Sequence, residues 1–338
     1  MRCYEFSDAI SLESLHLVER PDPKPGPSDI VIRMRAAALN FRDIAMLRGK
    51  YHIGVSPPLI PLSDGAGEVV QVGDSVKRFR IGDLVCPNYL PDWHSGPIQA
   101  ERVRRRLGGP TDGVLTEFMC LSEEEAVRAP AHLDATEAAA LPVAAATTYR
   151  ALYRMGALRP GETLLVQGAG AVSTTAVQLA TAGGARCISV SRNDRHASSL
   201  KKLGAEIVLT NGDSPDWPGA VREATGGNGA DVAMNVAGGQ TVTATVSATK
   251  LGGLVHLIGF VSGPIAEVDL FEAIRQGTTF QTATAGSRED LEAFIHVSEL
   301  NKFRPAIAKV LELKDLGAAI DAVDKGGQLG KVVLKLNF

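Results

Sequence analysis

The segment from Thr163 to Ser173 carries the clearest chemistry in the chain, because an apolar strand runs directly into a glycine-rich turn and then a helix. Such a turn lets backbone N–H groups approach phosphate oxygens, and the helix points the positive end of its dipole at them. We therefore predict that the pyrophosphate of a dinucleotide binds at Gly168, Gly170, Ala171 and Val172. Ser173 stands where the dinucleotide fingerprint has its third glycine, and serine is small enough to keep the helix packed on the strand.

The cofactor preference is predicted by the end of the next apolar run, which covers residues 187–190. NAD-binding units place an acidic residue there that holds the ribose 2′-hydroxyl. Here Ser191 leaves room, and Arg192 supplies positive charge for a 2′-phosphate. The sequence therefore favours NADP(H), and Asp194 lies close enough to keep NAD(H) as the alternative.

Alternating strands and helices surround this turn, as a phosphate-binding βαβ unit requires. Apolar runs predict strands at 207–209, 231–236 and 254–258, and helical stretches are predicted around 198–203, 218–225 and 241–251. This alternation is typical of an α/β fold with a doubly wound parallel sheet. The first third of the chain has short β-type runs broken by Pro and Gly, which predicts a small irregular β-barrel.

We expect three segments. Residues 1–125 form the first part of a catalytic barrel domain, 126–284 form the cofactor domain, and 285–338 return to the catalytic domain. The last segment carries predicted helices near 289–300 and 314–325 and a final strand at 332–336. A chain of 338 residues with 45% hydrophobic content is large enough for two cores.

Composition narrows the classes of function. The net charge of −3 gives no strong attraction to nucleic acid or to an acidic membrane. Four scattered cysteines fit a reducing compartment, and the sequence has no signal core or bilayer-length apolar run, so we expect a cytoplasmic protein without nucleic-acid or membrane partners. The basic run Arg102–Arg106 is typical of a solvated face, with the phosphates of an acyl-coenzyme A as the alternative ligand.

Several motifs in a fixed order carry a family resemblance: Asn40-Phe41-Arg42-Asp43, the stretch 61–70, Phe79 to Asp83, the glycine turn, and Gly330-Lys331-Val332-Val333. In this order the chain resembles the medium-chain dehydrogenase/reductase superfamily over essentially its whole length, and within it the zinc-lacking, quinone-oxidoreductase-like members. The resemblance implies a GroES-like barrel joined to a Rossmann domain. It also implies a homodimer formed through edge strands near 278–284.

The resemblance also identifies the positions that bind catalytic zinc in other members of the superfamily. Those members have Cys at the position of Asn40, a His-Glu pair at Ser63-Asp64, and a third ligand near Val143. Neutral Asn, Ser and Val do not replace thiolate and imidazole ligands. We therefore expect no metal in this chain.

By the same resemblance, Asn40 and Tyr51 lie beside the nicotinamide, and Tyr51 donates a hydrogen bond or a proton. The structural alternatives are that Asn40 caps a helix beginning at Phe41 and that Tyr51 packs at a domain junction. Asp43, Asp64 and His94 are expected to be structural or surface residues rather than catalytic ones. The family pattern assigns further cofactor contacts to Thr147, Asn235, Gly259, Phe260 and Lys331.

Without zinc, the reactions that need least polarisation of an oxygen are favoured. Hydride addition to a quinone or an α,β-unsaturated carbonyl spreads negative charge onto an oxygen that hydrogen bonds can hold. The sequence therefore predicts an NADPH-dependent oxidoreductase that reduces small-molecule quinones, enones or enoyl compounds. The alternatives are an alcohol dehydrogenase or carbonyl reductase, and a cofactor-binding protein without catalysis.

Overall fold

The computed structural model describes residues 1–49, 51, 54–156, 158–211 and 216–338. They form two compact units, one made of Met1–Ala146 with Ala285–Phe338 and the other of Thr147–Thr284. The N-terminal part of the first unit ends at Ala146 and its C-terminal part begins at Ala285; the limits expected from the sequence are residues 125 and 285.

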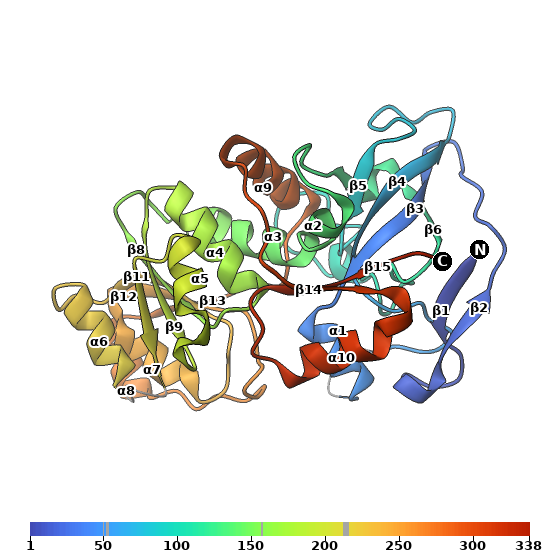
Figure 1. The fold of residues 1–338 in the computed structure, drawn as a ribbon. Helices are drawn as coiled ribbons and strands as arrows, with labels where there is room; N and C mark the ends of the chain where they lie inside the picture. The colour runs from blue at the N-terminus through green and yellow to red at the C-terminus, as the bar shows by residue number, and fades with distance from the viewer. Residues whose placement is uncertain (50, 52–53, 157, 212–215) are drawn as a thin grey trace. The chain divides into compact units, whose positions relative to one another are not determined.

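The first unit is built mainly on β-strands (Figure 1). Its strands are β1 (Arg2–Phe6), β2 (Leu15–Glu19), β3 (Asp29–Ala38), β4 (Asp64–Val72), β5 (Leu84–Pro87), β6 (Phe118–Ser122), β7 (Ala126–Arg128), β14 (Ile307–Glu312) and β15 (Lys331–Lys335). Its helices are α1 (Phe41–Leu47), α2 (Ala135–Ala139), the start of α3 (Pro142–Tyr149), α9 (Arg288–Asn301) and α10 (Leu316–Lys325), with short 3₁₀ turns at Leu12–Ser14, Glu101–Val103, Glu123–Glu125 and Leu313–Asp315.

A seven-stranded sheet in the order β14-β15-β3-β4-β5-β7, with β6 also paired to β3, forms the centre of this unit. The long strand β3 organises it, because β3 pairs antiparallel with β4, β6 and β15. Its buried alanines pack against Ala138 and Ala139 of α2. This contact explains why the first unit extends beyond residue 125.

The second unit contains a six-stranded parallel sheet. Its strands are β8 (Thr163–Gln167), β9 (Arg186–Ser191), β10 (Ile207–Thr210), β11 (Ala230–Asn235), β12 (Thr249–Leu257) and β13 (Thr279–Thr282). Its helices are the end of α3, a π-helical segment Arg150–Met155, α4 (Ala171–Ala182), a 3₁₀ turn Asp194–His196, α5 (Ala197–Lys202), α6 (Trp217–Ala224), α7 (Thr241–Ala248) and α8 (Leu270–Gln276).

The strand order β10-β9-β8-β11-β12-β13 reverses direction at β8. Right-handed crossovers then place α4 and α5 on one face of the sheet and α6, α7 and α8 on the other. The α/β doubly wound fold expected from the sequence is therefore confirmed, and the glycine turn lies at the point where the order reverses. Among the helices that the structure describes, none combines the length and the apolar content needed to cross a bilayer.

Candidate active site

The first unit holds a buried polar cluster at the start of α1. Asn40 occupies the position before the helix, and its backbone N–H donates to Asp43 Oδ2 at 2.8 Å. The helix start expected at Phe41 is thus confirmed. Asp43 is 1% exposed, and burial raises the pKa of its carboxyl while the adjacent Arg42 opposes that shift.

The start of β4 brings Ser63 and Asp64 to the same place, because Asp64 pairs in register with Ala38 near the end of β3. The Asn40 Nδ2 group donates to Ser63 Oγ at 3.0 Å. The Ser63 hydroxyl in turn donates to Asp43 Oδ1 at 3.3 Å. Asp64 Oδ1 accepts the backbone N–H of Val143 at 3.0 Å, so this carboxylate also holds the first turn of α3.

Lys331, the first residue of β15, completes the cluster. Its Nζ donates to Asn40 Oδ1 at 2.5 Å and to Asp64 Oδ2 at 2.7 Å. Lys331 and Asp64 are 3% and 0% exposed. The strand reaches this position because Gly330 has a φ of +73°, and a Cβ there would lie 1.8 Å from the carbonyl oxygen of Ala306. The Gly330-Lys331 pair is therefore needed for the geometry of the cluster.

Arg42 connects this cluster to two tyrosines. Its guanidinium donates to Asp43 Oδ1 and to the carbonyl oxygens of Leu107 and Gly109, each at 3.1 Å. The same group lies 5.2 Å from the ring centroid of Tyr51 and 5.1 Å from that of Tyr89. Burial raises the pKa of the Tyr89 hydroxyl, and Arg42 opposes this shift.

Tyr51 is half-buried, and its neighbours 50, 52 and 53 lie outside the described residues. Asn40 directly precedes α1, and the ring of Tyr51 lies against the guanidinium of Arg42, the second residue of that helix. Asp43, which was expected to be structural, is engaged by Asn40, Ser63 and Arg42.

The donor set at this site does not suit zinc. Zinc sites use thiolate, imidazole and carboxylate ligands. Here Asn40 offers an amide, Ser63 offers a hydroxyl, and the carboxylate of Asp64 already binds the Lys331 ammonium. Within the described ranges, no group of three His, Cys, Asp or Glu side chains is arranged to hold a metal ion.

The second unit offers a cradle for a dinucleotide at the glycine turn. Gly168 has a φ of +79°, and Gly170 precedes α4. A Cβ placed on Gly170 would have no heavy atom of the described residues within 4 Å, so a ligand has room to approach the backbone there. Ser173 Oγ donates to the carbonyl oxygen of Gln167 at 2.6 Å, which explains how serine replaces the third glycine. The predicted contacts Gly168, Gly170, Ala171 and Val172 form this turn and the first turn of α4.

The end of β9 carries the residues predicted to select the cofactor. Ser191 is buried, and its hydroxyl donates to the carbonyl oxygen of Asn193 at 2.5 Å. Arg192 is exposed. Ser191 therefore shapes the turn, whereas Arg192 is the residue of this pair that presents charge to solvent.

Asn235 lies at the end of β11 and is fully buried. Its Nδ2 donates to the hydroxyls of Thr241 and Thr245 at 3.0 and 2.9 Å, and its Oδ1 accepts the N–H of Gly238 at 2.7 Å. The side chain thus fixes the loop that follows the strand. Thr241 and Thr245 were missed in the sequence, where they resembled ordinary residues of an amphipathic helix.

The remaining residues predicted to contact the cofactor differ in how deeply they are buried and in what they contact. Thr147 is 3% exposed, and Phe260 is half-buried. A Cβ on Gly259 would lie 2.1 Å from the carbonyl oxygen of Val236, so this glycine permits two turns to pack closely. Lys331 was predicted to bind the cofactor, and its Nζ is engaged by Asn40 and Asp64.

The loop between β5 and β6 contains His94 and the basic run. His94 is half-buried. Within the run, Arg102 donates to the carbonyl oxygens of Ser95 and Pro97, and Arg105 forms ion pairs with Asp92 and Glu125. Two arginines of the run therefore hold the loop together.

Comparisons with known proteins agree with this architecture. Residues 26–131 match the family model of the alcohol dehydrogenase GroES-like domain, and residues 171–299 match that of the zinc-binding dehydrogenase. A zinc-type alcohol dehydrogenase-like protein of Schizosaccharomyces pombe is 30% identical over 320 residues, which cover 93% of this chain and 92% of that protein. An acryloyl-coenzyme A reductase of Sulfurisphaera tokodaii is 27% identical over 327 residues, which cover 94% of this chain and 96% of that protein. A solved NAD-dependent alcohol dehydrogenase superposes with a TM-score of 0.90 at 29% identity, covering 99% of both chains.

Proposed function

Because the chain belongs to the medium-chain dehydrogenase/reductase superfamily, a family of nicotinamide-dependent oxidoreductases, we propose that it is a zinc-independent, NADPH-dependent reductase of quinones or α,β-unsaturated carbonyl compounds. One observation carries this proposal. The Lys331 ammonium donates hydrogen bonds to Asn40 and Asp64, which stand at positions that bind zinc in other members of the superfamily. The site therefore offers hydrogen-bond donors in place of a Lewis acid.

The proposed reaction suits such donors. A bound nicotinamide cofactor supplies the hydride. As the β-carbon of an enone accepts it, negative charge moves to the carbonyl oxygen, and a proton supplied by the Tyr51 hydroxyl or by water then reaches the α-carbon or that oxygen. Asn40 Nδ2 has two protons, and Ser63 accepts one of them. We propose that the second Asn40 N–H and the Tyr51 hydroxyl each donate a hydrogen bond to the substrate oxygen and so stabilise its developing negative charge.

The carboxylates of the site argue against the oxidation of a simple alcohol. That reaction needs a group that accepts the hydroxyl proton. Asp43 already accepts bonds from Asn40, Ser63 and Arg42, and Asp64 binds Lys331 and the Val143 N–H. The similarity to an acryloyl-coenzyme A reductase, which acts on an activated alkene, supports the proposed class. The names of the other relatives keep alcohol or carbonyl oxidoreduction as the second candidate.

A substrate screen tests the proposed function. Quinones, enones, enoyl-coenzyme A thioesters and simple ketones are offered with NADPH and with NADH, and alcohols with the oxidised cofactors, while bound zinc is measured in the same preparation. We expect turnover of quinones or enones with substoichiometric zinc. Turnover restricted to ketones and alcohols would favour the second candidate. Binding of cofactor without turnover of any class would favour a non-catalytic protein.

The preference for NADPH rests on Arg192, which is exposed at the end of β9. A guanidinium there binds a 2′-phosphate through charge-assisted hydrogen bonds. Fluorescence titration of the wild-type protein with both cofactors tests this preference. Equal affinity, or tighter binding of NADH, would contradict it.

We also propose that the protein is a homodimer that pairs through β13. This strand is the last in the sheet order, so one of its edges lacks a partner strand among the described residues. Next to it in the chain, α8 exposes the apolar side chains Leu270, Phe271 and Ile274, which are 69%, 77% and 78% exposed. Unpaired edges and apolar patches of this kind are typical of surfaces that a second subunit covers.

A further inference from the structure

Lys331 is unusual because it is a lysine that is almost completely buried, and such residues are rare unless they are paired. Its Nζ contacts Asn40 Oδ1 at 2.5 Å and Asp64 Oδ2 at 2.7 Å. Asp64 balances its charge, so the contact with Asn40 is not needed for charge neutralisation. That second contact therefore requires its own explanation.

The contact fixes which way the Asn40 amide faces. An ammonium group only donates, so the atom that faces Lys331 must be the carbonyl oxygen of the amide. The Nδ2 group then faces Ser63 Oγ, which accepts from it at 3.0 Å. The Ser63 hydroxyl donates a hydrogen bond to Asp43 Oδ1, because a carboxylate only accepts. The donors therefore run in one direction, from Lys331 through Asn40 and Ser63 to Asp43.

We propose that Lys331 is a positioning residue: its ammonium locks the Asn40 carboxamide with its N–H groups available as donors and polarises that amide. The role assigned to the second Asn40 proton rests on the proposed function, whereas the locking of the amide does not. Asn40 is half-buried, so this side chain retains access to solvent. Hydrogen bonds in a low-dielectric site polarise one another, so the ammonium bound to the amide oxygen makes the Asn40 N–H groups stronger donors.

This role differs from binding the cofactor, which was the prediction from the motif. A lysine that contacts a phosphate should change the affinity for the cofactor when it is removed. A lysine that acts through Asn40 should change turnover and leave that affinity intact. The two roles therefore predict opposite patterns for the same substitution.

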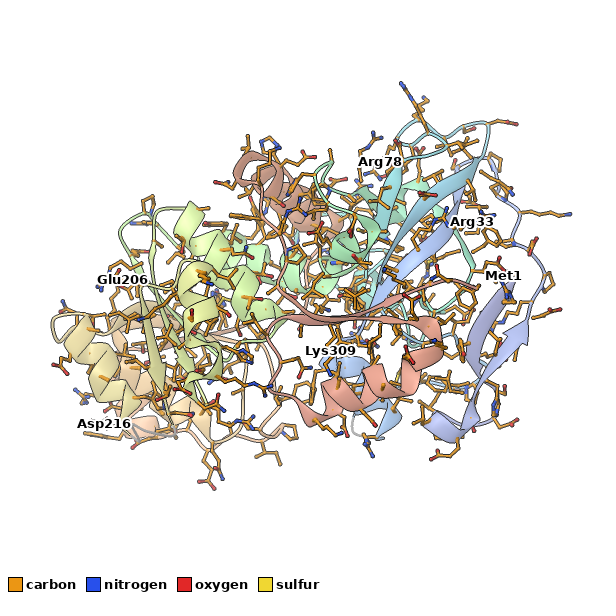
Figure 2. The ribbon with its side chains drawn as sticks, viewed as in Figure 1. Met1, Arg33, Arg78, Glu206, Asp216 and Lys309 are labelled. Carbon is orange, nitrogen blue, oxygen red and sulfur yellow. The ribbon has the colours of Figure 1, made fainter. Side chains whose placement is uncertain are left out.

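The test uses a paired variant, because removing Lys331 alone would leave Asp64 as a buried charge without a partner. Lys331→Met/Asp64→Asn removes both charges and keeps an oxygen that accepts the Val143 N–H. Lys309→Met is the matched control, since Lys309 lies on the neighbouring strand β14, pairs in register with Val332 and is exposed (Figure 2). The kcat, the KM and the Kd for NADPH are measured for each protein, with and without Asn40→Ala.

We expect the paired variant to lose about 10- to 10²-fold in kcat, the effect of losing a hydrogen bond to a charged group. The Kd for NADPH should change by less than about twofold, and the same pair should cost less than about twofold in the Asn40→Ala background. A large increase in the Kd would overturn the proposal in favour of cofactor binding. An undiminished loss in the Asn40→Ala background would also overturn it, because Lys331 would then act without Asn40.

A second measurement needs neither substrate nor cofactor. The ¹⁵N order parameter of the Asn40 side-chain amide, assigned with Asn40→Ala, should be high in the wild type and in Lys309→Met and low in the paired variant. An unchanged order parameter would overturn the positioning role even if the enzyme reduces enones. A lowered order parameter in a protein that reduces neither quinones nor enones would support the positioning role and reject only the proposed function.

Discussion

Lowering the pH from about 7.5 to about 5 should destabilise the second unit, Thr147–Thr284, by about 2 kcal/mol through a single side chain, His256. Because this unit carries the predicted dinucleotide turn, we call it the cofactor unit. His256 lies in β12 and is 0% exposed. Neither ring nitrogen makes a well-formed hydrogen bond within the described part of the chain. Burial lowers the pKa of His256 to about 4, and a weaker interaction with the backbone of Ala151 opposes that shift.

The direction and size of the effect follow from the two pKa values. In the unfolded chain a histidine has a pKa of about 6.5. Above that pH the side chain is neutral in both states, so the stability does not depend on its titration. Between that value and a folded pKa of about 4, the unfolded state binds a proton that the folded state does not. The free energy of unfolding therefore decreases as the pH falls. The full difference is worth about 3 kcal/mol, of which about 2 kcal/mol is lost by about pH 5.

The two tryptophans allow the units to be followed separately. Trp93 lies in the first unit and Trp217 in the second, and the chain contains no other tryptophan. In a Trp93→Phe background, the fluorescence of Trp217, which is 6% exposed in α6, reports the unfolding of the cofactor unit in urea. Urea titrations at both pH values give the change in stability. His256→Leu removes the titrating group and should reduce the pH dependence.

His196→Gln is the matched control, because His196 is a half-buried histidine of the same unit. It should keep the wild-type dependence on pH. If His256→Leu loses as much stability on acidification as the wild type does, the buried histidine is not the cause and the reasoning is refuted.

Other consequences concern the site and the assembly. Tyr51→Phe should slow turnover by about 10- to 10³-fold in steady-state assays, the effect of losing one transition-state donor, and an unchanged rate would remove Tyr51 from the mechanism. Arg192→Ala should weaken the binding of NADPH by about 10-fold in fluorescence titrations while NADH binding is preserved, and an equal loss for both would contradict the assignment. Phe271→Asp should yield a monomer in light scattering, whereas Leu12→Asp, an exposed apolar position in the first unit, should leave the mass unchanged. A wild-type monomer would reject pairing through β13.

The fold of the cofactor unit was predictable because its information is local. Each apolar strand and each helix of a βαβ unit can be recognised from the pattern of apolar residues in a short stretch of sequence. The preference for right-handed crossovers then fixes the topology. The main local difference concerns residues 249–251, where a helix was expected. The structure ends α7 at Ala248 and begins β12 at Thr249, which pairs with Ala230 of β11. The boundary between helix and strand is set by pairing with β11, which lies earlier in the chain, so the local pattern of apolar residues does not predict it.

The candidate site was predictable as a list of residues and not as a set of contacts. Asn40 and Lys331 are separated by 291 positions, and Asp64 and Lys331 by 267. Their proximity depends on the antiparallel register of β15 and β3, in which Val333 lies opposite Ala38. Arg42 was missed as a site residue for a related reason: its partners Leu107 and Gly109 lie in a loop whose path no sequence pattern indicates.

The charges of the cluster balance one another without a metal ion. Four charges are buried together: Arg42 and Lys331 carry positive charge, and Asp43 and Asp64 carry negative charge. Each anion contacts one of the cations, so the cluster is neutral as it stands. A zinc ion at Asp64 would have to displace Lys331, and a buried ammonium without its partner costs several kcal/mol. The proposed zinc-independent chemistry therefore rests on the cation that β15 supplies at Lys331 as much as on the presence of an amide, Asn40, where other members of the superfamily have a thiolate.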